Sequence, residues 1–187
     1  TSTTGGTPGL ANTTAITSSS VALPYGSTWR YDDSGADLGT AWRSSSFVDT
    51  AWKQGKAQLG FGEGDEATVI STGPSTNRIL TAYFRRTFDV ASTAGLTSAY
   101  VDLIRDDGAV VYVNGVEVGR TNMPSGTITY GSYATVGLFG TDETTPVRIT
   151  IPTSVLRAGS NTIAVEVHQN SRSSSDMSFD ARLTVTR

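Results

Sequence analysis

A β-hairpin with two adjacent acids at its mouth is the sequence feature that most constrains the fold. Residues 109–118 are mostly β-branched or aromatic, and they surround Asn114-Gly115, a dipeptide that strongly favours a two-residue hairpin turn. Asp106 and Asp107 stand just before this hairpin, at a second turn marked by glycine. Adjacent carboxylates repel each other unless a cation, an arginine or hydrogen-bond donors compensate them. The group that neutralises this pair therefore decides whether the turn is a binding site.

The rest of the chain carries the same β pattern. Only residues 152–159 and 46–52 suggest a helical turn, so we expect little helix. Strands are expected at residues 27–32, 82–90, 96–105, 109–113, 116–120, 147–151, 161–168 and 177–185. About eight strands with long, unequal connections favour a double-sheet jelly roll over an up-and-down barrel. The predicted class is therefore all-β, as a two-sheet jelly-roll β-sandwich.

The connections between these strands differ in length, and the longer ones are polar. Because strand direction alternates in a jelly roll, connections 33–80, 106–108, 121–146 and 169–176 should emerge at the same end. Rigid sandwiches commonly bind ligands at such loop-rich ends. We therefore expect the acid pair and His168 to share a rim with the most elaborate loops.

Composition excludes several classes of partner. The 187 residues include 14 basic and 17 acidic ones, so no cationic field attracts DNA or RNA, and nucleic acid is not an expected partner. The apolar runs have the length of strands, far short of the roughly 20 residues that cross a bilayer, so we expect no membrane partner. The chain has no cysteine and one histidine, which excludes thiol catalysis, disulfides and His-rich zinc sites.

The first 20 residues differ in composition from the remainder. Residues 1–20 are rich in Thr, Ser and Gly and carry too little apolar surface to offset the entropy of ordering them. We interpret this segment as an interdomain linker, which leaves residues 21–187 as one binding module. Such linkers suggest a secreted, extracellular multidomain protein. The alternative, a frayed terminus of a complete protein, stays open.

Several runs resemble a module that recurs in large secreted bacterial proteins. They begin with STWRYDDSGADLGTAWRSSSFVDTAWKQGKAQLGFGEGDEAT and end with NTIAVEVHQNSRSSSDMSFDARL, and the resemblance covers about residues 27–185. The plan is similar to the galactose-binding-like jelly roll, including the non-catalytic sugar-binding domain of family-2 glycoside hydrolases. The elements that carry this likeness are Tyr83 to Phe88, Tyr112 to Gly115 and Gly159 to Val165. The resemblance implies the fold and a sugar ligand.

The Asp-Asp-Gly element is also similar to that of protective-antigen-type lectin domains, where paired aspartates hold a calcium that touches the sugar. Carried over, this role falls on Asp106 and Asp107, whose hard oxygen atoms suit Ca²⁺. The alternative is turn chemistry, in which the aspartates accept nearby backbone N–H groups and Arg105 or Arg172 balances the charge. Both interpretations remain open.

A second acidic loop offers an alternative calcium site. Asp32, Asp33 and Asp37 are spaced across a glycine-containing turn, although the loop lacks the third acid and terminal Glu of an EF-hand. Related sugar-binding modules often keep a structural calcium away from the ligand, which the resemblance would assign to this loop or to residues 63–66. A solvated turn without metal is the other interpretation.

Candidate ligand contacts come from the loops at the predicted rim. Tyr130 and Tyr133 lie in a long loop, where an aromatic ring is free to stack on a sugar. His168 ends a strand and points away from its apolar face, so it either holds a loop or touches ligand. Trp29 and Trp52 are expected in the core. Glu166 and Arg182 are expected to pair across adjacent strands. The full set of expected ligand-binding residues is Arg105, Asp106, Asp107, Tyr130, Tyr133, His168, Asn170, Arg172 and Asp176.

The same inventory argues against catalysis. No G-x-S-x-G motif occurs and no serine is marked as a partner for His168, although paired carboxylates for glycoside hydrolysis remain open. We predict a non-catalytic carbohydrate-binding module of a secreted polysaccharide-active or other hydrolytic enzyme, with calcium assisting the binding. Its partners would be a polysaccharide or oligosaccharide and a parent catalytic domain in the same chain. The alternative is a structural spacer or protein-interaction domain.

Overall fold

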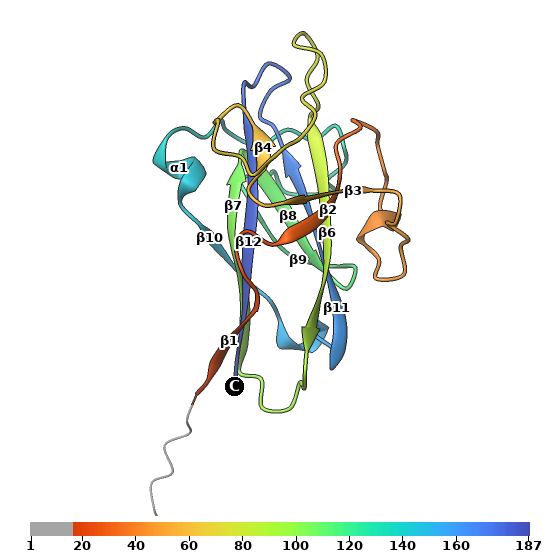
Figure 1. Ribbon diagram of the computed structural model, residues 1–187, viewed down its shortest axis with the longest axis vertical. Coiled ribbons are helices and arrows are strands. Elements are labelled where there is room, and N and C mark those ends of the chain that lie inside the picture. Colours follow the sequence, from red (N-terminus) through yellow and green to blue (C-terminus); the bar gives the residue numbers. More distant parts are fainter. Residues whose placement is uncertain (1–16) are drawn as a thin grey trace, which may run out of the picture.

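The computed structural model describes residues 17–187 as a sandwich of two six-stranded sheets (Figure 1). The first sheet has the order β10 (Val147–Thr150), β7 (Ser98–Asp106), β12 (Met177–Thr186), β4 (Leu59–Phe61) and β5 (Thr68–Val69), with β1 (Ser19–Leu23) paired to β12. The second sheet has the order β3 (Lys53–Lys56), β2 (Thr28–Asp32), β6 (Thr81–Val90), β11 (Gly159–His168), β8 (Gly108–Val113) and β9 (Val116–Thr121). All pairs are antiparallel except β4 with β5. The predicted all-β sandwich is confirmed.

The eight predicted strands are all present, but β1, β3, β4 and β5 add to them. These additional strands have two to five residues, too few to show the alternation that marks a half-buried strand, and β3 and β4 also contain glycine. One 3-10 helix, Thr153–Val155, lies in the segment where we expected a helical turn. The other lies at Ala41–Arg43 and not within 46–52, and a four-residue helix, α1 (Thr141–Thr144), was not predicted.

The main core fills the space between the two sheets. Phe179 from β12 stacks on Phe84 from β6 with ring centroids 4.1 Å apart, and it meets the edge of Trp29 at 4.8 Å. These three aromatic side chains are fully buried. They join the sheets at the centre of the sandwich, as expected for Trp29 from its alternation with Tyr31.

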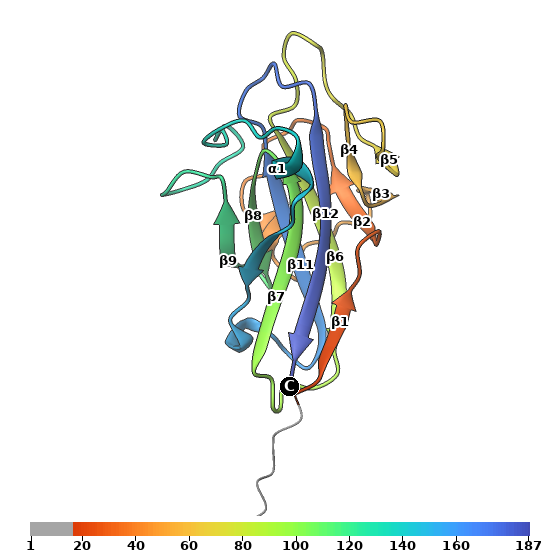
Figure 2. The ribbon, with the colours of Figure 1, turned by 90° about the vertical axis from the view of Figure 1, so that its left-hand side faces the viewer.

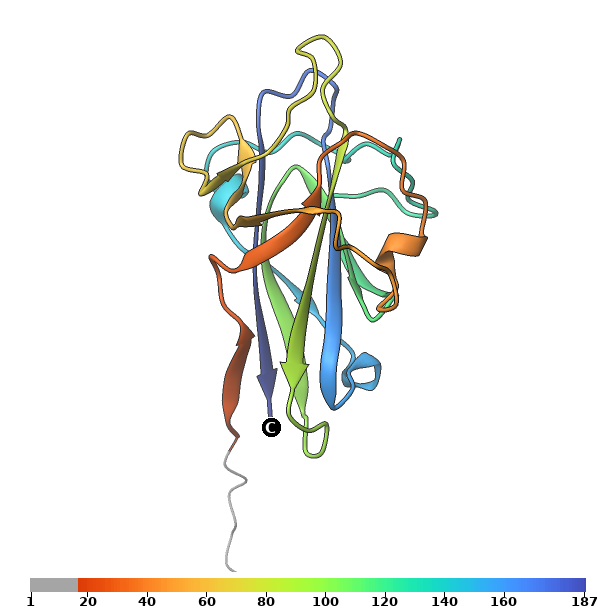
Figure 3. The same ribbon diagram turned by 45° about the vertical axis from the view of Figure 1, so that its right-hand side comes forward.

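A second apolar cluster covers the outer face of the second sheet. Trp42 packs against Tyr83 and Tyr112, with ring centroids 4.8 and 5.7 Å away, and all three side chains are buried. The segment that carries Trp42 folds over β6, β11 and β8, which Figure 3 shows beside the sheet. The central strands of this sheet are consequently buried on both faces, so polar residues on its outer face, such as Glu166, lie inside the protein.

The long connections gather at one end of the sandwich, which we call the apex. Figures 1 and 2 show these loops at the top, while the C-terminus lies at the opposite end. Backbone hydrogen bonds join the loops to one another, for example from Gln169 to Leu80 and from Arg78 to Arg172. The predicted clustering of the loops at one end is therefore confirmed.

The expected linker, residues 1–20, lies mostly outside the described residues. Its last two residues, Ser19 and Ser20, already belong to β1 and pair with Thr186 and Val185 of β12. Within residues 17–187, no helix has the length and apolarity required to cross a membrane.

Candidate functional site

Asp107 joins three apical segments through its side chain and backbone. One carboxylate oxygen accepts the backbone N–H of Leu138 at 2.7 Å, and the other accepts the backbone N–H of Asn170 at 2.7 Å. The backbone carbonyl accepts the side-chain amide of Asn122 at 3.2 Å. The side chain is buried, so both of its oxygens are occupied by the protein itself. Of the two sequence-based interpretations, these contacts match the one in which Asp107 caps backbone groups.

Asp106 has a different environment. Only 1% of its surface is exposed, and neither carboxylate oxygen has a hydrogen-bond donor in the described part of the chain. Burial, followed by contact with the Asp107 carboxylate and by the charges of Asp107, Asp176 and Glu143, raises the pKa of Asp106 to about 9. Without a compensating cation this carboxyl group therefore keeps its proton at neutral pH.

Three further acids converge beside Asp106 at the apex. Glu63, Glu143 and Asp176 each place a carboxylate oxygen within 4.8 Å of the others. They come from the loop after β4, from α1 and from the loop before β12. Burial and the neighbouring carboxylates raise the pKa values of Glu63 and Glu143. Asp176 was an expected site residue, and Glu63 belonged to an alternative acidic loop, but Glu143 was not anticipated because α1 was not.

The alternative calcium loop does not gather its acids around one point. Asp33 is buried, pairs with Lys53 at 2.7 Å and accepts the backbone N–H of Ser71 at 2.7 Å. Asp32 accepts the backbone N–H and hydroxyl of Ser34, and Asp37 accepts the backbone N–H of Gly39. These are the short-range bonds of turn aspartates. The three residues therefore match the solvated-turn interpretation better than a metal site.

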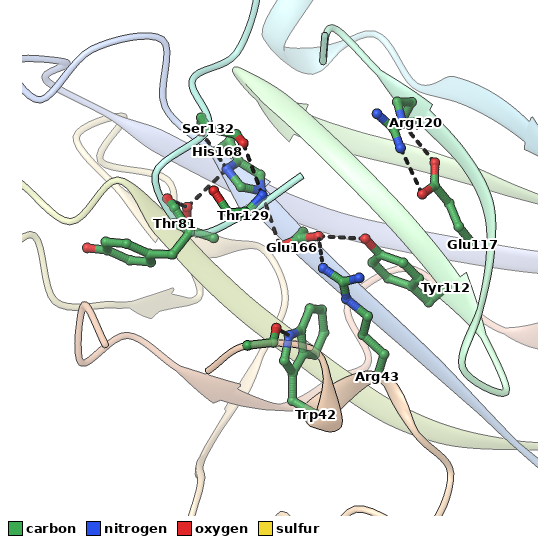
Figure 4. Close-up of polar contacts among 12 residues, drawn as sticks. Trp42, Arg43, Thr81, Tyr112, Glu117, Arg120, Thr129, Ser132, Glu166 and His168 are labelled. Atoms are coloured by element: carbon green, nitrogen blue, oxygen red, sulfur yellow. Dashed lines mark hydrogen bonds and ion pairs between the residues drawn. The ribbon is translucent and has the colours of Figure 1, made fainter. Parts of the chain in front are cut away.

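His168 lies at the inner end of a buried polar network on the outer face of the second sheet (Figure 4). Its Nδ1 donates to the backbone carbonyl of Ser132 at 2.8 Å and lies 3.0 Å from the Thr81 hydroxyl. Its Nε2 lies 3.3 Å from Glu166 Oε2. The imidazole is fully buried. It therefore holds the 121–146 loop to β6 and β11, and no ligand in solvent reaches it.

Glu166 is the centre of the same network. Its Oε1 accepts the Tyr112 hydroxyl at 2.6 Å and pairs with Arg43 at 3.1 Å (Figure 4). Burial alone would raise the pKa of Glu166, but the bonds and charges of His168, Tyr112 and Arg43 together lower it below its usual value. Arg43 also lies over the Tyr112 ring, 4.4 Å from its centroid. This network fixes the segment that carries Trp42 to the sheet.

The expected pair between Glu166 and Arg182 is absent. The two residues lie in β11 and β12, which belong to different sheets, so they are not cross-strand neighbours. Arg182 instead pairs with Asp102 at 2.8 Å, and Arg148 reaches the same carboxylate at 2.7 Å. This second ion-pair group lies on the outer face of the first sheet.

A pocket of about 190 Å³ opens at the apex. Tyr130 and Arg172, both expected ligand contacts, line it together with Asn77 and Arg78. Arg172 donates to the Asn77 side chain at 3.1 Å and to the Arg78 carbonyl at 3.4 Å. The remaining lining residues are small or polar: Ser34, Gly35, Ser71, Gly73 and Pro74, with the Ile79 side chain at the base.

The other expected contacts lie around this end of the sandwich without forming one pocket. Arg105 is buried and donates to the Asp142 carbonyl at 2.9 Å and to the Thr121 hydroxyl at 3.4 Å. Tyr133 is 43% exposed, and Asn170 is bound through its backbone to Asp107. The structure thus brings Tyr130 and Arg172 together in an open pocket, whereas Asp106, Asp107, Arg105 and His168 are enclosed.

The pocket includes residues that the sequence did not mark. Asn77 and Arg78 follow β5 in a segment without periodicity, so no sequence pattern assigned them to the apex. The only available signal was polar composition within the long 33–80 connection.

The fold is shared with domains of bacterial glycosidases. The chain is similar to a calcium-binding mutant of Bacteroides uniformis β-glucuronidase 2, with a TM-score of 0.58, 18% identity, and coverage of 91% of this chain and 18% of that one. A glycosyl hydrolase family 2 member from Bacteroides cellulosilyticus gives a TM-score of 0.55 at 19% identity, covering 89% of this chain and 20% of the other. No protein-family model matches the sequence, and no curated protein matches it significantly.

These comparisons establish the fold and the scale of the unit. The chain spans about a fifth of the length of each of these two glycosidases. The matched region is therefore a small part of each of these two enzymes. Because the identities are below 20%, the similarity shows the fold alone, and the ligand has to be inferred from the residues of the site.

Proposed function

We propose that this chain is a non-catalytic carbohydrate-binding module of a larger secreted glycan-active or other hydrolytic enzyme. The observation that carries the proposal is the apical pocket, which presents amide, guanidinium, hydroxyl and phenol groups from four chain segments. Such planar polar groups hydrogen-bond sugar hydroxyls, and an aromatic ring packs on the apolar face of a pyranose. The volume of about 190 Å³ suits a single sugar ring better than a longer segment of glycan.

The charges at the pocket suggest which glycans bind best. Arg78 and Arg172 line it, and neither forms an ion pair with a carboxylate of residues 17–187. A guanidinium group binds a carboxylate through two parallel hydrogen bonds. Glycans that contain uronic acid should therefore bind more tightly than neutral ones of the same length.

Binding without catalysis fits the remaining chemistry of the apex. His168 and Asp107 are enclosed and occupied by protein groups, so they have no access to a substrate. A module that holds glycan weakly raises the local concentration of its parent catalytic domain on that glycan. Calcium assistance, the finer part of this proposal, would act by ordering the apical loops, and its site is argued in the next subsection.

The experiment is a binding survey by affinity electrophoresis and calorimetry on polysaccharides with and without uronic acid. We expect wild type to bind an acidic polysaccharide and Arg172→Gln to bind it at least about tenfold more weakly, equivalent to about 1.4 kcal/mol. Arg120→Gln, which removes the same charge from β9 away from the pocket, should bind like wild type. Absence of binding to every polysaccharide, or equal losses in the two variants, would refute the proposal.

An alternative function as a protein-interaction domain has one specific observation in its favour. Tyr133, Val136 and Phe139, in the loop between β9 and α1, are 43%, 56% and 80% exposed. Exposed apolar side chains in one loop are typical of contact surfaces. Substituting Phe139→Ser should leave glycan binding unchanged if the pocket is the functional site.

A further inference from the structure

The strand pairing brings acids from separate segments to one point at the apex. Ser178 of β12 pairs with Asp106 of β7, and Met177 pairs with Phe61 of β4. The residues next to these pairs, Asp176 and Gly62, approach so closely that a Cβ on Gly62 would lie 2.7 Å from the Cβ of Asp176. Glu63 is the next residue after Gly62 in the chain. α1 packs against β7 and adds Glu143, so that one oxygen of each of Glu63, Glu143 and Asp176 lies within 4.8 Å of the others.

Solvent does not explain Asp106, which pairs with Ser178, two residues after Asp176. Exposed acidic groups are common because water screens their repulsion. Asp106, however, has only 1% of its surface exposed. Neither of its carboxylate oxygens has a hydrogen-bond donor within residues 17–187. The cluster acids Asp176 and Glu143 are close enough to disfavour its charged form. A buried carboxylate without a partner is expensive unless a cation coordinates it.

The protein supplies no ion pair to these four carboxylates. Within residues 17–187, none of Asp106, Glu63, Glu143 and Asp176 lies within 4.0 Å of a basic side-chain nitrogen. Arg105 is the nearest buried cation in sequence, but its terminal nitrogens donate to the Asp142 carbonyl and the Thr121 hydroxyl. Its charge therefore offsets the repulsion only in part.

We propose that Glu63, Glu143 and Asp176 bind one calcium ion, which also compensates the buried carboxylate of Asp106. The ligand atoms are carboxylate oxygens, which hard divalent cations prefer, and the histidine and thiolate ligands typical of zinc are missing from this cluster. Oxygens around Ca²⁺ lie at about 2.3–2.6 Å, so two of them are separated by at most about 5 Å. The oxygens of Glu63, Glu143 and Asp176 lie within 4.8 Å of one another, which fits within this limit. Flexible carboxylates from separate loops suit Ca²⁺ better than the strict octahedron of Mg²⁺.

The ion would connect three apical segments: the loop after β4, α1 and the loop before β12. Asp176 precedes β12 in the loop that also carries Arg172 of the pocket. Ordering this loop would place Arg172 for a ligand. The proposed calcium site does not depend on the proposed glycan binding, and calcium binding is tested without glycan.

The test is calorimetric titration of CaCl₂ into protein that has been stripped with a chelator, together with its thermal unfolding. We expect one site per chain, and a melting temperature that rises by about 5 °C or more at a calcium concentration about 100 times Kd. Glu143→Gln and Asp176→Asn should each weaken calcium at least about tenfold. Asp65→Asn removes the same charge from the Glu63 loop outside the cluster and should leave the affinity unchanged.

Asp106→Asn keeps the shape of the side chain and removes the carboxylate that a bound cation would compensate. This variant should fold without calcium and show little calcium response. MgCl₂ at the same concentration should shift the melting temperature of wild type much less than CaCl₂. The proposal is overturned if wild type takes up no calcium at millimolar concentration, or if Glu143→Gln, Asp176→Asn and Asp106→Asn retain the wild-type response.

Discussion

Asp107 and Asn170 lie 63 positions apart in the sequence, yet the carboxylate of Asp107 accepts the backbone N–H of Asn170 at 2.7 Å. The second oxygen of the same carboxylate holds Leu138 at 2.7 Å. The aspartate that resembled a ligand in the sequence thus connects the two loops that flank the apex. Hydrogen bonds from buried N–H groups to a charged carboxylate are strong, and loss of the carboxylate leaves both N–H groups without an acceptor.

Asp107→Ala should therefore destabilise the protein by about 3–5 kcal/mol in urea unfolding, because two backbone N–H groups lose their acceptor. Asp142→Ala is the matched control, since Asp142 is exposed and contributes its backbone carbonyl rather than its side chain to the apical contacts. The control should change stability by less than about 0.5 kcal/mol. Equal effects of the two substitutions would show that Asp107 does not hold the loops.

Glu166→Gln tests the buried network of Figure 4. The amide still accepts the Tyr112 hydroxyl, but the charge that balances Arg43 is gone, so we expect a loss of about 3 kcal/mol in the free energy of unfolding. Glu117→Gln breaks the ion pair with Arg120 at the surface and should cost less than about 1 kcal/mol. A loss below about 1 kcal/mol for Glu166→Gln would contradict a structural role for this network.

Stability should depend on pH through Asp102. Hydrogen bonds from Arg148 and Arg182 lower the pKa of this carboxyl group below its ordinary value of 3.8, although burial opposes the shift. The stabilisation is therefore complete above about pH 4 and disappears as the pH falls through the lowered pKa. Urea unfolding should show wild type more stable than Asp102→Asn at pH 7, and the difference should shrink by pH 2. A difference that persists at pH 2 would exclude this origin.

Gly62→Ala tests the close approach of the β4 loop to the loop before β12. Gly62 has φ of +104°, and a Cβ there would lie 2.6 Å from the Ser175 carbonyl. We expect a destabilisation of about 2 kcal/mol or more in urea unfolding. Gly64 also has a positive φ, but a Cβ there would meet no atom within 4 Å. Gly64→Ala therefore measures the cost of backbone strain without a steric clash. Similar losses in both variants would argue against a tight contact at Gly62.

The alternation of apolar residues predicted the long strands and, through their directions, the end at which the loops gather. It did not predict how the strands divide between sheets. Glu166 and Arg182 were therefore expected to pair, whereas β11 and β12 lie in opposite sheets and each residue has another partner. The sheet that a strand joins is decided by packing across the sandwich. The periodicity of apolar residues along a strand carries no information about that packing.

The sequence also did not predict which residues at the apex are buried. Asp106, Asp107 and His168 sit at strand ends, where exposure is the default, but all three are buried, and the 121–146 loop contacts both Asp107 and His168. Tyr130 and Arg172 were identified because their loops are rich in glycine and serine, and the structure places both in one pocket. Asn77, Arg78 and Glu143 were missed because short segments without periodicity position them.

The central claim is that the pocket formed by Tyr130, Arg172, Asn77 and Arg78 receives glycan. Its most direct test is an amide chemical-shift titration of the labelled module with an oligosaccharide that contains uronic acid. The account predicts saturable shifts confined to the segments that line the pocket, which are residues 34–35, residues 71–79, Tyr130 and residues 170–176. Shifts that gather elsewhere, such as around the basic pocket of Arg30, Arg85 and Arg86, or no shifts at millimolar oligosaccharide, would contradict it.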